Sequence, residues 1–296
     1  VPTIANTGIK SNYSLKLDVT TVDSSIAAGD FSGVQAFIEG YDYASIKDQT
    51  VTLSFWVKGT KTGIHCVSFR NNANDRSYVV EYTINTTLTW EKKEMTLVLD
   101  QSGGTENYTN GAGLSLFWTL SSGSTFHTTA NAWQTGNFLA TSSQVNATDS
   151  TSNNFWLSQV KLEKNDEVTS FVSLPFSEEL ARCKRCFFKT FQYATTPATS
   201  AGTAEGVRFP ALTAGATAHR PNSVFFPVTM RIAPAITFFN PSAGNAQVRD
   251  VTGAADCTAT TAAAVTDTLV DINFTGAAGT AVGNSMIVCF TAEAGF

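Results

Sequence analysis

The chain has 296 residues, of which 15% are charged and 11% aromatic, and this length allows one large domain or two ordinary ones. Nineteen Lys and Arg against 24 Asp and Glu give a net charge of −5, which argues against a general phosphate-binding surface and hence against nucleic acid as a partner. The longest uninterrupted apolar run, Met286–Phe290, is far shorter than the roughly 20 residues that cross a bilayer, so no membrane insertion is expected.

The first part of the chain alternates apolar and polar residues with a period of two, which is typical of half-buried strands. Turn-rich stretches at 70–76 and 101–113 carry Asn, Asp and Gly. Many short strands separated by such turns predict an all-β fold, with a jelly-roll β-sandwich over residues 1–175. The alternating segments lie at 13–19, 51–57, 95–99, 114–120 and 155–162.

A helical signal interrupts this pattern at residues 176–186. Ser177 is a residue type that caps helix N-termini, and Glu178 and Glu179 follow it, while Arg182, Lys184 and Arg185 stand near the other end. Acidic residues in the first turn and basic ones in the last complement the helix dipole. The sequence therefore predicts a short helix that links two domains.

Residues 187–296 form the predicted second domain, again a β-sandwich. Residues 191–296 contain no lysine and only ten charged side chains. The Ala-, Thr- and Gly-rich tracts 194–204, 252–265 and 276–283 are interpreted as long loops. A surface with so few charges favours burial against further copies of the same chain. The predicted strands lie at 207–209, 223–230, 235–240, 246–251, 269–274 and 285–291.

Signals for catalysis are missing from the sequence. The histidines His65, His127 and His219 are isolated from one another, no G-x-S-x-G motif occurs, and no pair of acids is singled out for glycoside cleavage. Cys183 and Cys186 have metal-ligand spacing, but no second pair of ligands is near them. We therefore expect no enzyme activity and no cofactor. A structural calcium ion, common in jelly rolls, stays open without assigned ligands.

Aromatic side chains in polar surroundings are the best candidates for stacking on a sugar. Trp133 stands in a polar, glycine-containing loop with His127 upstream, and both are predicted to contact carbohydrate, although a loop tryptophan also often plugs one end of a sandwich. Trp56 is out of phase with the apolar residues around it and faces either a binding surface or a covering loop. Tyr108, in an Asn-rich loop, is a further candidate.

Three groups of motifs, spread over nearly the whole chain, point to one architecture. The first group lies in the jelly roll (13–17, 51–58 and 89–93), the second around the predicted helix (159–163, 167–171 and 179–188), and the third in the second domain (224–234 and 290–294). Together they resemble a phage tail-fibre and virion-attachment module, in which a carbohydrate-binding-module-like jelly roll precedes a short helix and a C-terminal β-domain. Lys161 and Cys186 depart from the family pattern, at positions that look structural.

The resemblance implies a virion protein of a tail fibre or capsid fibre that binds bacterial surface glycans, contacts other virion proteins and forms a homotrimer. The trimer contacts are expected in the lysine-free domain, with Phe225, Phe226, Phe238 and Phe239 as candidates. Two alternatives stay open: a purely architectural decoration protein of the virion, and the accessory module of a secreted polysaccharide-active enzyme.

Overall fold

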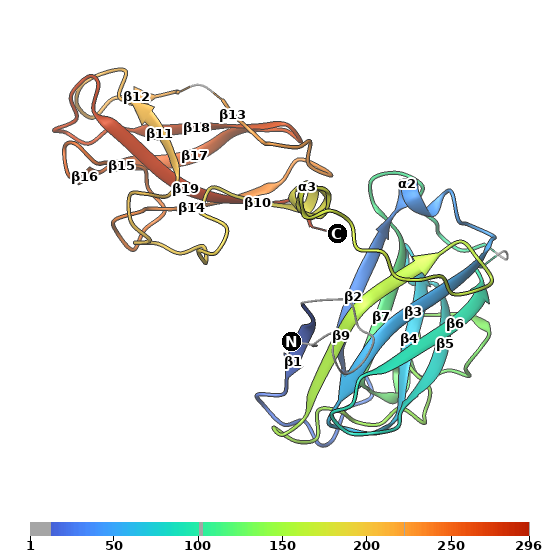
Figure 1. Ribbon diagram of the computed structural model, residues 1–296. Coiled ribbons are helices and arrows are strands. Elements are labelled where there is room, and N and C mark those ends of the chain that lie inside the picture. The colour runs from blue at the N-terminus through green and yellow to red at the C-terminus, as the bar shows by residue number, and fades with distance from the viewer. Residues whose placement is uncertain (1–12, 101–102, 222, 296) are drawn as a thin grey trace. The chain divides into compact units, whose positions relative to one another are not determined.

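The computed structural model describes residues 13–100, 103–221 and 223–295, and these are arranged almost entirely in strands. The chain divides into two compact units, called unit 1 and unit 2 below, with the boundary in the sequence between Val172 and Ser173 (Figure 1). The all-β fold predicted from the sequence is confirmed.

Unit 1 is a sandwich of two antiparallel sheets. In sheet A the strand order is β1 (Leu15–Asp18), β9 (Asn154–Glu163), β3 (Thr50–Gly59) and β6 (Glu91–Val98). In sheet B it is β2 (Phe31–Glu39), β7 (Ala112–Ser122), β4 (Gly63–Asn71), β5 (Arg76–Ile84) and β8 (Trp133–Thr135). The short helix α2 (Gly40–Tyr43) follows β2, and the 3-10 turn η1 (Ser124–Phe126) follows β7.

The pairing of these strands is nested along the chain. Strand β1 pairs with β9, β2 with β7, β3 with β6, and β4 with β5, all antiparallel. A long hairpin that is rolled up on itself gives this pattern, which is the jelly roll with its two opposed sheets. Unit 1 is therefore the jelly-roll sandwich that the sequence predicts.

The core of unit 1 lies between the two sheets. Alternate residues of β3, such as Leu53, Phe55 and Val57, point inward from sheet A and are fully buried. From sheet B, Trp118 packs edge-on against Phe55 with the ring centroids 5.6 Å apart, and only 1% of its surface is exposed. Trp118 is therefore one of the core residues of unit 1.

Strand β2 lies very close to β7 at one point. The pairing register shifts between Ser32 and Gly33, and a Cβ atom on Gly33 would lie 2.2 Å from the carbonyl oxygen of Trp118. Only glycine fits at this position, so Gly33 allows the edge strand to follow β7 along its whole length.

Unit 2 begins with the helix α3 (Phe176–Cys186) and contains two further sheets. The long strand β19 (Ser285–Glu293) pairs with β10 (Phe187–Lys189), β11 (Val207–Pro210), β14 (Ala235–Phe239) and β15 (Arg249–Asp250), and β16 (Ala255–Asp256) extends this sheet from β15. The other sheet is built around β18 (Leu269–Thr275), which pairs with β12 (Ala218–His219), β13 (Val224–Phe225) and β17 (Thr258–Val265). Apolar residues of β18 and β19 form the core between them.

Two local expectations are wrong. The tract 252–265 is not one long loop, because Thr258–Val265 forms the strand β17, which pairs with β18 through two register shifts. Ser177 is not the helix cap: α3 begins at Phe176, Pro175 occupies the cap position, and no side chain there hydrogen-bonds to the helix. The acidic first turn and basic last turn of α3 are as expected.

Candidate functional site

Trp133, the leading candidate from the sequence, is a structural residue of unit 1. It begins β8, packs half-buried against the core, and lies 5.5 Å from the ring of Tyr78. Its indole N–H donates a hydrogen bond to the carbonyl oxygen of Val98 over 2.8 Å. These contacts fit the second of the two roles that the sequence left open, in which the tryptophan closes the sandwich, and sugar contact by Trp133 stays a prediction.

The side chains of His127 and Tyr108 also contact neighbouring residues of unit 1. The imidazole Nε2 of the half-buried His127 lies 3.1 Å from both the carbonyl and the hydroxyl oxygen of Ser122. The ring of Tyr108 stacks on that of Tyr43 at 6.0 Å, and the ammonium group of Lys47 lies 5.2 Å from the Tyr108 ring centroid. The structure brings neither residue together with Trp133 as one site.

Trp56 lies on the outward face of sheet A. Its neighbours across the sheet are Lys92 on β6 and Ser158 on β9, and its ring is half-buried. It shares this face with Lys58, whose ammonium group lies 4.3 Å from the ring of Trp156 and 5.2 Å from that of Trp90. Burial, and then the charge of nearby Lys16, lower the pKa of Lys58.

These cation–π contacts bear on how a sugar could use the face. The ammonium group of Lys58 lies over the rings of Trp90 and Trp156. These are the two rings that a sugar could stack on in addition to Trp56. A pyranose ring stacking on either tryptophan would have to displace the ammonium group. The outward face of sheet A is therefore a poorer stacking platform than its tryptophans alone suggest.

The outward face of sheet B contains an open groove of about 300 Å³, called the Arg70 groove below. Side chains from β2, β4 and β7 line it, together with residues of the adjoining loops. The lining residues are Phe31, Gln35, Phe37, Arg70, Asn71, Asn72, Asn74, Ala112, Ser115 and Asn137.

Strand register explains how these side chains meet. Phe37 pairs with Ser115, and Ser115 pairs with Arg70, so these three form one row across β2, β7 and β4. In the adjacent row, Gln35 pairs with Phe117. Because side chains of paired residues point to the same face of a sheet, the groove combines apolar rings with amide, hydroxyl and guanidinium groups.

Arg70 is the most unusual of these residues. Only 4% of its surface is exposed, and burial lowers the pKa of its guanidinium to about 10. Its Nη1 atom donates to the side-chain oxygen of Asn137 over 2.9 Å, and its Cζ atom lies 5.5 Å from the ring centroid of Phe117. Its Nε atom has no hydrogen-bond partner within the described chain.

A loop also packs on the outward face of sheet B. The segment after β7 packs Phe138 and Ala140 against Cys66 and Val79. Thr119 on β7 donates its hydroxyl hydrogen to the carbonyl oxygen of Leu139 over 2.7 Å. The loop thus covers this part of the face, and the Arg70 groove stays open.

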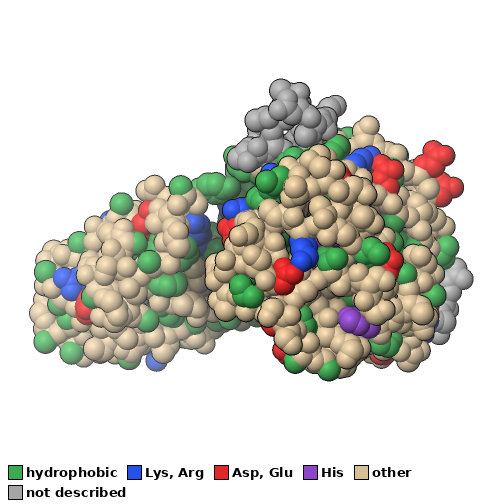
Figure 2. Space-filling view, turned by 90° about the horizontal axis from the view of Figure 1, so that it is seen from below, with side chains coloured by type: hydrophobic (Ala, Val, Ile, Leu, Met, Phe, Trp, Pro, Cys, Tyr) green, Lys and Arg blue, Asp and Glu red, His purple; other side chains and the backbone are tan. Residues whose placement is uncertain are grey.

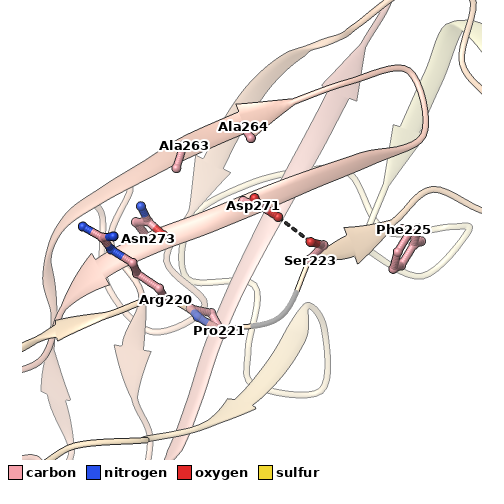
Figure 3. A pocket seen from close by; sticks show the side chains of 8 residues that line it. All are labelled: Arg220, Pro221, Ser223, Phe225, Ala263, Ala264, Asp271 and Asn273. Atoms are coloured by element: carbon pink, nitrogen blue, oxygen red, sulfur yellow. Dashed lines mark hydrogen bonds between the residues drawn. The ribbon is translucent and has the colours of Figure 1, made fainter.

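Unit 2 has a larger and more open pocket of about 700 Å³, shown in Figure 3. In that view the hydroxyl of Ser223 points at the carboxylate of Asp271, to which it donates a hydrogen bond of 2.5 Å. Arg220 and Asn273 lie on the other side of Asp271, and Phe225 stands apart at one end. The pocket joins polar groups to an exposed ring, but its carboxylate already has a hydrogen-bond donor.

The four phenylalanines predicted as trimer contacts differ in their surroundings. Phe225 is 70% exposed, whereas Phe226 is 8% exposed and belongs to the core of unit 2. Phe238 and Phe239 are half-buried and contact neighbouring phenylalanine rings edge-on. Phe226 is thus a core residue and no contact for a partner copy, and Phe225 is the one of the four whose ring is mainly on the surface.

Metal, membrane and charge features of the described residues are modest. No three His, Cys, Asp or Glu side chains in the described ranges are grouped so that they could hold a metal ion. None of the described helices is long and apolar enough to cross a membrane. On the face shown in Figure 2, charged side chains are scattered and form no broad patch of one sign.

Comparison with known proteins adds little to this description. No protein-family model matches the chain, and no curated protein matches it. Among the solved structures that match, recombinant discoidin II of Dictyostelium discoideum is 11% identical, with 92% of this chain and 79% of that one covered and a TM-score of 0.22. The wild-type discoidin II of the same organism is 10% identical, with coverages of 92% and 78% and a TM-score of 0.21. TM-scores this low establish no shared fold, so the jelly roll rests on the strand order of this chain itself.

Proposed function

We propose that unit 1 binds glycans in the Arg70 groove and that the chain serves as an adhesion component of a phage virion, in a tail fibre or capsid fibre. The observation that carries the binding part is the composition of the groove. Exposed rings of Phe31 and Phe37 lie beside the amide groups of Gln35 and Asn137 and the guanidinium of Arg70. Stacking on an apolar sugar face combined with hydrogen bonds to hydroxyl groups is how shallow protein sites hold carbohydrate.

The virion part of the proposal is supported by the motifs around the helix and in unit 2, which resemble phage attachment proteins. On this proposal the ligands are bacterial surface glycans, and the other partners are virion proteins and further copies of the chain. Three copies held together would raise the avidity of a weak site by about 10²–10⁴-fold, because the second and third contacts become intramolecular.

The proposed role is binding without turnover. Glycoside cleavage needs two carboxyl groups on either side of the scissile bond, and the described lining of the Arg70 groove contains no Asp, Glu or His. The groove lining therefore supports adhesion rather than catalysis. Release of reducing sugar from a host polysaccharide by the purified chain would contradict this part of the proposal.

A glycan array with the intact chain and two variants tests the proposal. Phe37→Ala removes a ring that is 37% exposed in the groove and should abolish the array signal while the fold is retained. Tyr193→Ala, at a ring 73% exposed in unit 2, is the matched control and should keep the signal. A chain that binds no host surface glycan would favour the architectural role, and equal signals from all three proteins would place the site elsewhere.

A further inference from the structure

The charge of Arg70 has no acidic partner in the described chain. Arg76 pairs with Asp100 at 2.5 Å and Arg249 pairs with Asp256 at 2.8 Å, as is usual for arginines that are mostly buried. Arg70 is more deeply buried than either, yet its side chain donates to a neutral amide, that of Asn137. Its guanidinium also lies over the neutral ring of Phe117.

A buried charge without a counter-charge is costly for a protein. Taking an ion out of water is unfavourable unless an opposite charge and hydrogen bonds replace the lost hydration. The lowered pKa of Arg70 expresses that cost, because desolvation is its cause. An arginine at this position is thus poorly explained by the stability of unit 1 alone.

The surroundings of Arg70 suit an anion that comes from outside. Arg70 is the one charged residue in the described lining of the groove, so no carboxylate of the protein competes for it. Its Nε atom is buried and makes no hydrogen bond within the described chain, while Nη1 is held in place by Asn137. Guanidinium groups bind carboxylates through two parallel N–H···O bonds, and such bonds strengthen where water is excluded.

The residues around Arg70 indicate what kind of molecule bears the anionic group. Phe37 and Ser115 stand in the same row of the sheet as Arg70, with Gln35 in the next row. A sugar ring packed on Phe37 would present its hydroxyl groups to Gln35 and a ring substituent to Arg70. The row is therefore arranged for a sugar that bears a carboxylate, not for a free inorganic anion.

We propose that the Arg70 groove selects acidic glycans, those that contain uronic or other carboxylated sugars, and that Arg70 pairs with the sugar carboxylate. This inference rests on the proposed function, since it names the class of glycan for the same site. A site for neutral glycans would not show this preference for carboxylated sugars over neutral ones.

Titration calorimetry of the full chain with matched probes tests this inference. Trigalacturonate and its methyl ester have the same sugar rings but differ in charge, as do sialyllactose and lactose. We expect the acid of at least one pair to bind at least tenfold more tightly than its neutral partner, with affinity that falls as salt is raised. The variant Arg70→Gln should lose this preference, and Arg70→Lys should keep part of it because the charge remains without the planar fork.

Arg182→Gln is the matched control, because it removes the same charge from an exposed position on α3 and should leave binding unchanged. Circular dichroism establishes that each variant is folded, and if Arg70→Gln does not fold, the comparison of acid and ester on the unaltered chain decides. Equal affinity for acid and neutral partner would overturn the inference while leaving glycan binding intact. Binding of none of the four probes, together with an empty glycan array, would remove the proposed function as well.

Discussion

Replacing Arg70 by methionine should change the stability of unit 1 very little, although the side chain is almost fully buried. The fall of the guanidinium pKa from 12.5 to about 10 corresponds to a burial cost of about 3 kcal/mol, at 1.36 kcal/mol per pKa unit. Methionine is uncharged and similar in length, so this cost disappears.

The substitution also removes two favourable contacts. A hydrogen bond from a charged donor, here to Asn137, contributes about 1.5–3 kcal/mol, and the contact with the Phe117 ring about 0.5–1 kcal/mol. The gain and the losses nearly cancel. The expected change in the free energy of unfolding therefore lies within about 1 kcal/mol of zero.

Chemical denaturation followed by tryptophan fluorescence measures this change. All five tryptophans of the chain lie in unit 1, so the signal reports that unit without interference from unit 2. The control is Arg76→Met, which leaves the buried carboxylate of Asp100 without its ion pair and should cost about 3–5 kcal/mol. A loss of 3 kcal/mol or more for Arg70→Met would refute the reasoning, since Arg70 would then be a structural residue.

Three further predictions concern residues outside the groove. Trp133→Phe removes the hydrogen bond to Val98 and should lower the free energy of unfolding by about 1 kcal/mol without loss of glycan binding; lost binding with an intact fold would restore Trp133 as a contact residue. Burial lowers the pKa of His65 to about 4, so the unfolded chain takes up a proton between pH 6.5 and 4 that the folded chain does not. Stability of unit 1 should fall by about 3 kcal/mol over that range, and a His65→Gln variant should not show this fall; the same pH dependence in the variant would mean that other groups cause it. For the proposed homotrimer, Phe225→Ser should shift the chain from trimer to monomer in analytical ultracentrifugation with little loss of stability, whereas Phe226→Ala should cost about 3–5 kcal/mol of unfolding free energy. A trimer in the unaltered chain that is unchanged in Phe225→Ser argues against Phe225 as a contact.

Strands whose apolar residues all lie on one face could be predicted from the sequence, because apolar and polar residues alternate along them. Strand β3 is an example, since Leu53, Phe55 and Val57 all point into the core and the residues between them point outward. Strand β2 could not be predicted, because apolar and polar residues do not alternate along it. It carries Phe31 and Phe37 on its outward face, so apolar residues occur on both faces and the period of two disappears.

The Arg70 groove could not be predicted either, because its lining depends on strands that the sequence pattern did not reveal. The sequence places Arg70 at the start of a turn, whereas β4 extends through Asn71 and gives Arg70 a place in the sheet. The available signal was the strand-like run from Ile64 to Phe69, which is followed directly by Arg70, but nothing local shows that the charge of Arg70 is unpaired. That property depends on strands β2 and β7, which are far away in the sequence.

Strand β17 and Trp133 show two further limits. The alanines and threonines of β17 are small and partly exposed, so their pattern carries little periodic signal, and pairing with β18 decides their structure. The loop around Trp133 is polar, and its tryptophan turns inward because the carbonyl oxygen of Val98 and the ring of Tyr78 are placed to receive it. In both cases contacts distant in sequence override local composition.

A crystal structure of the chain soaked with a glycan that binds in solution tests the central claim most directly. Ordered density for a sugar packed on Phe37, with its hydrogen bonds to Gln35 and Arg70, is the predicted result. Density for the same sugar on the tryptophans of sheet A or in the pocket beside Phe225, with the Arg70 groove unoccupied, would contradict it.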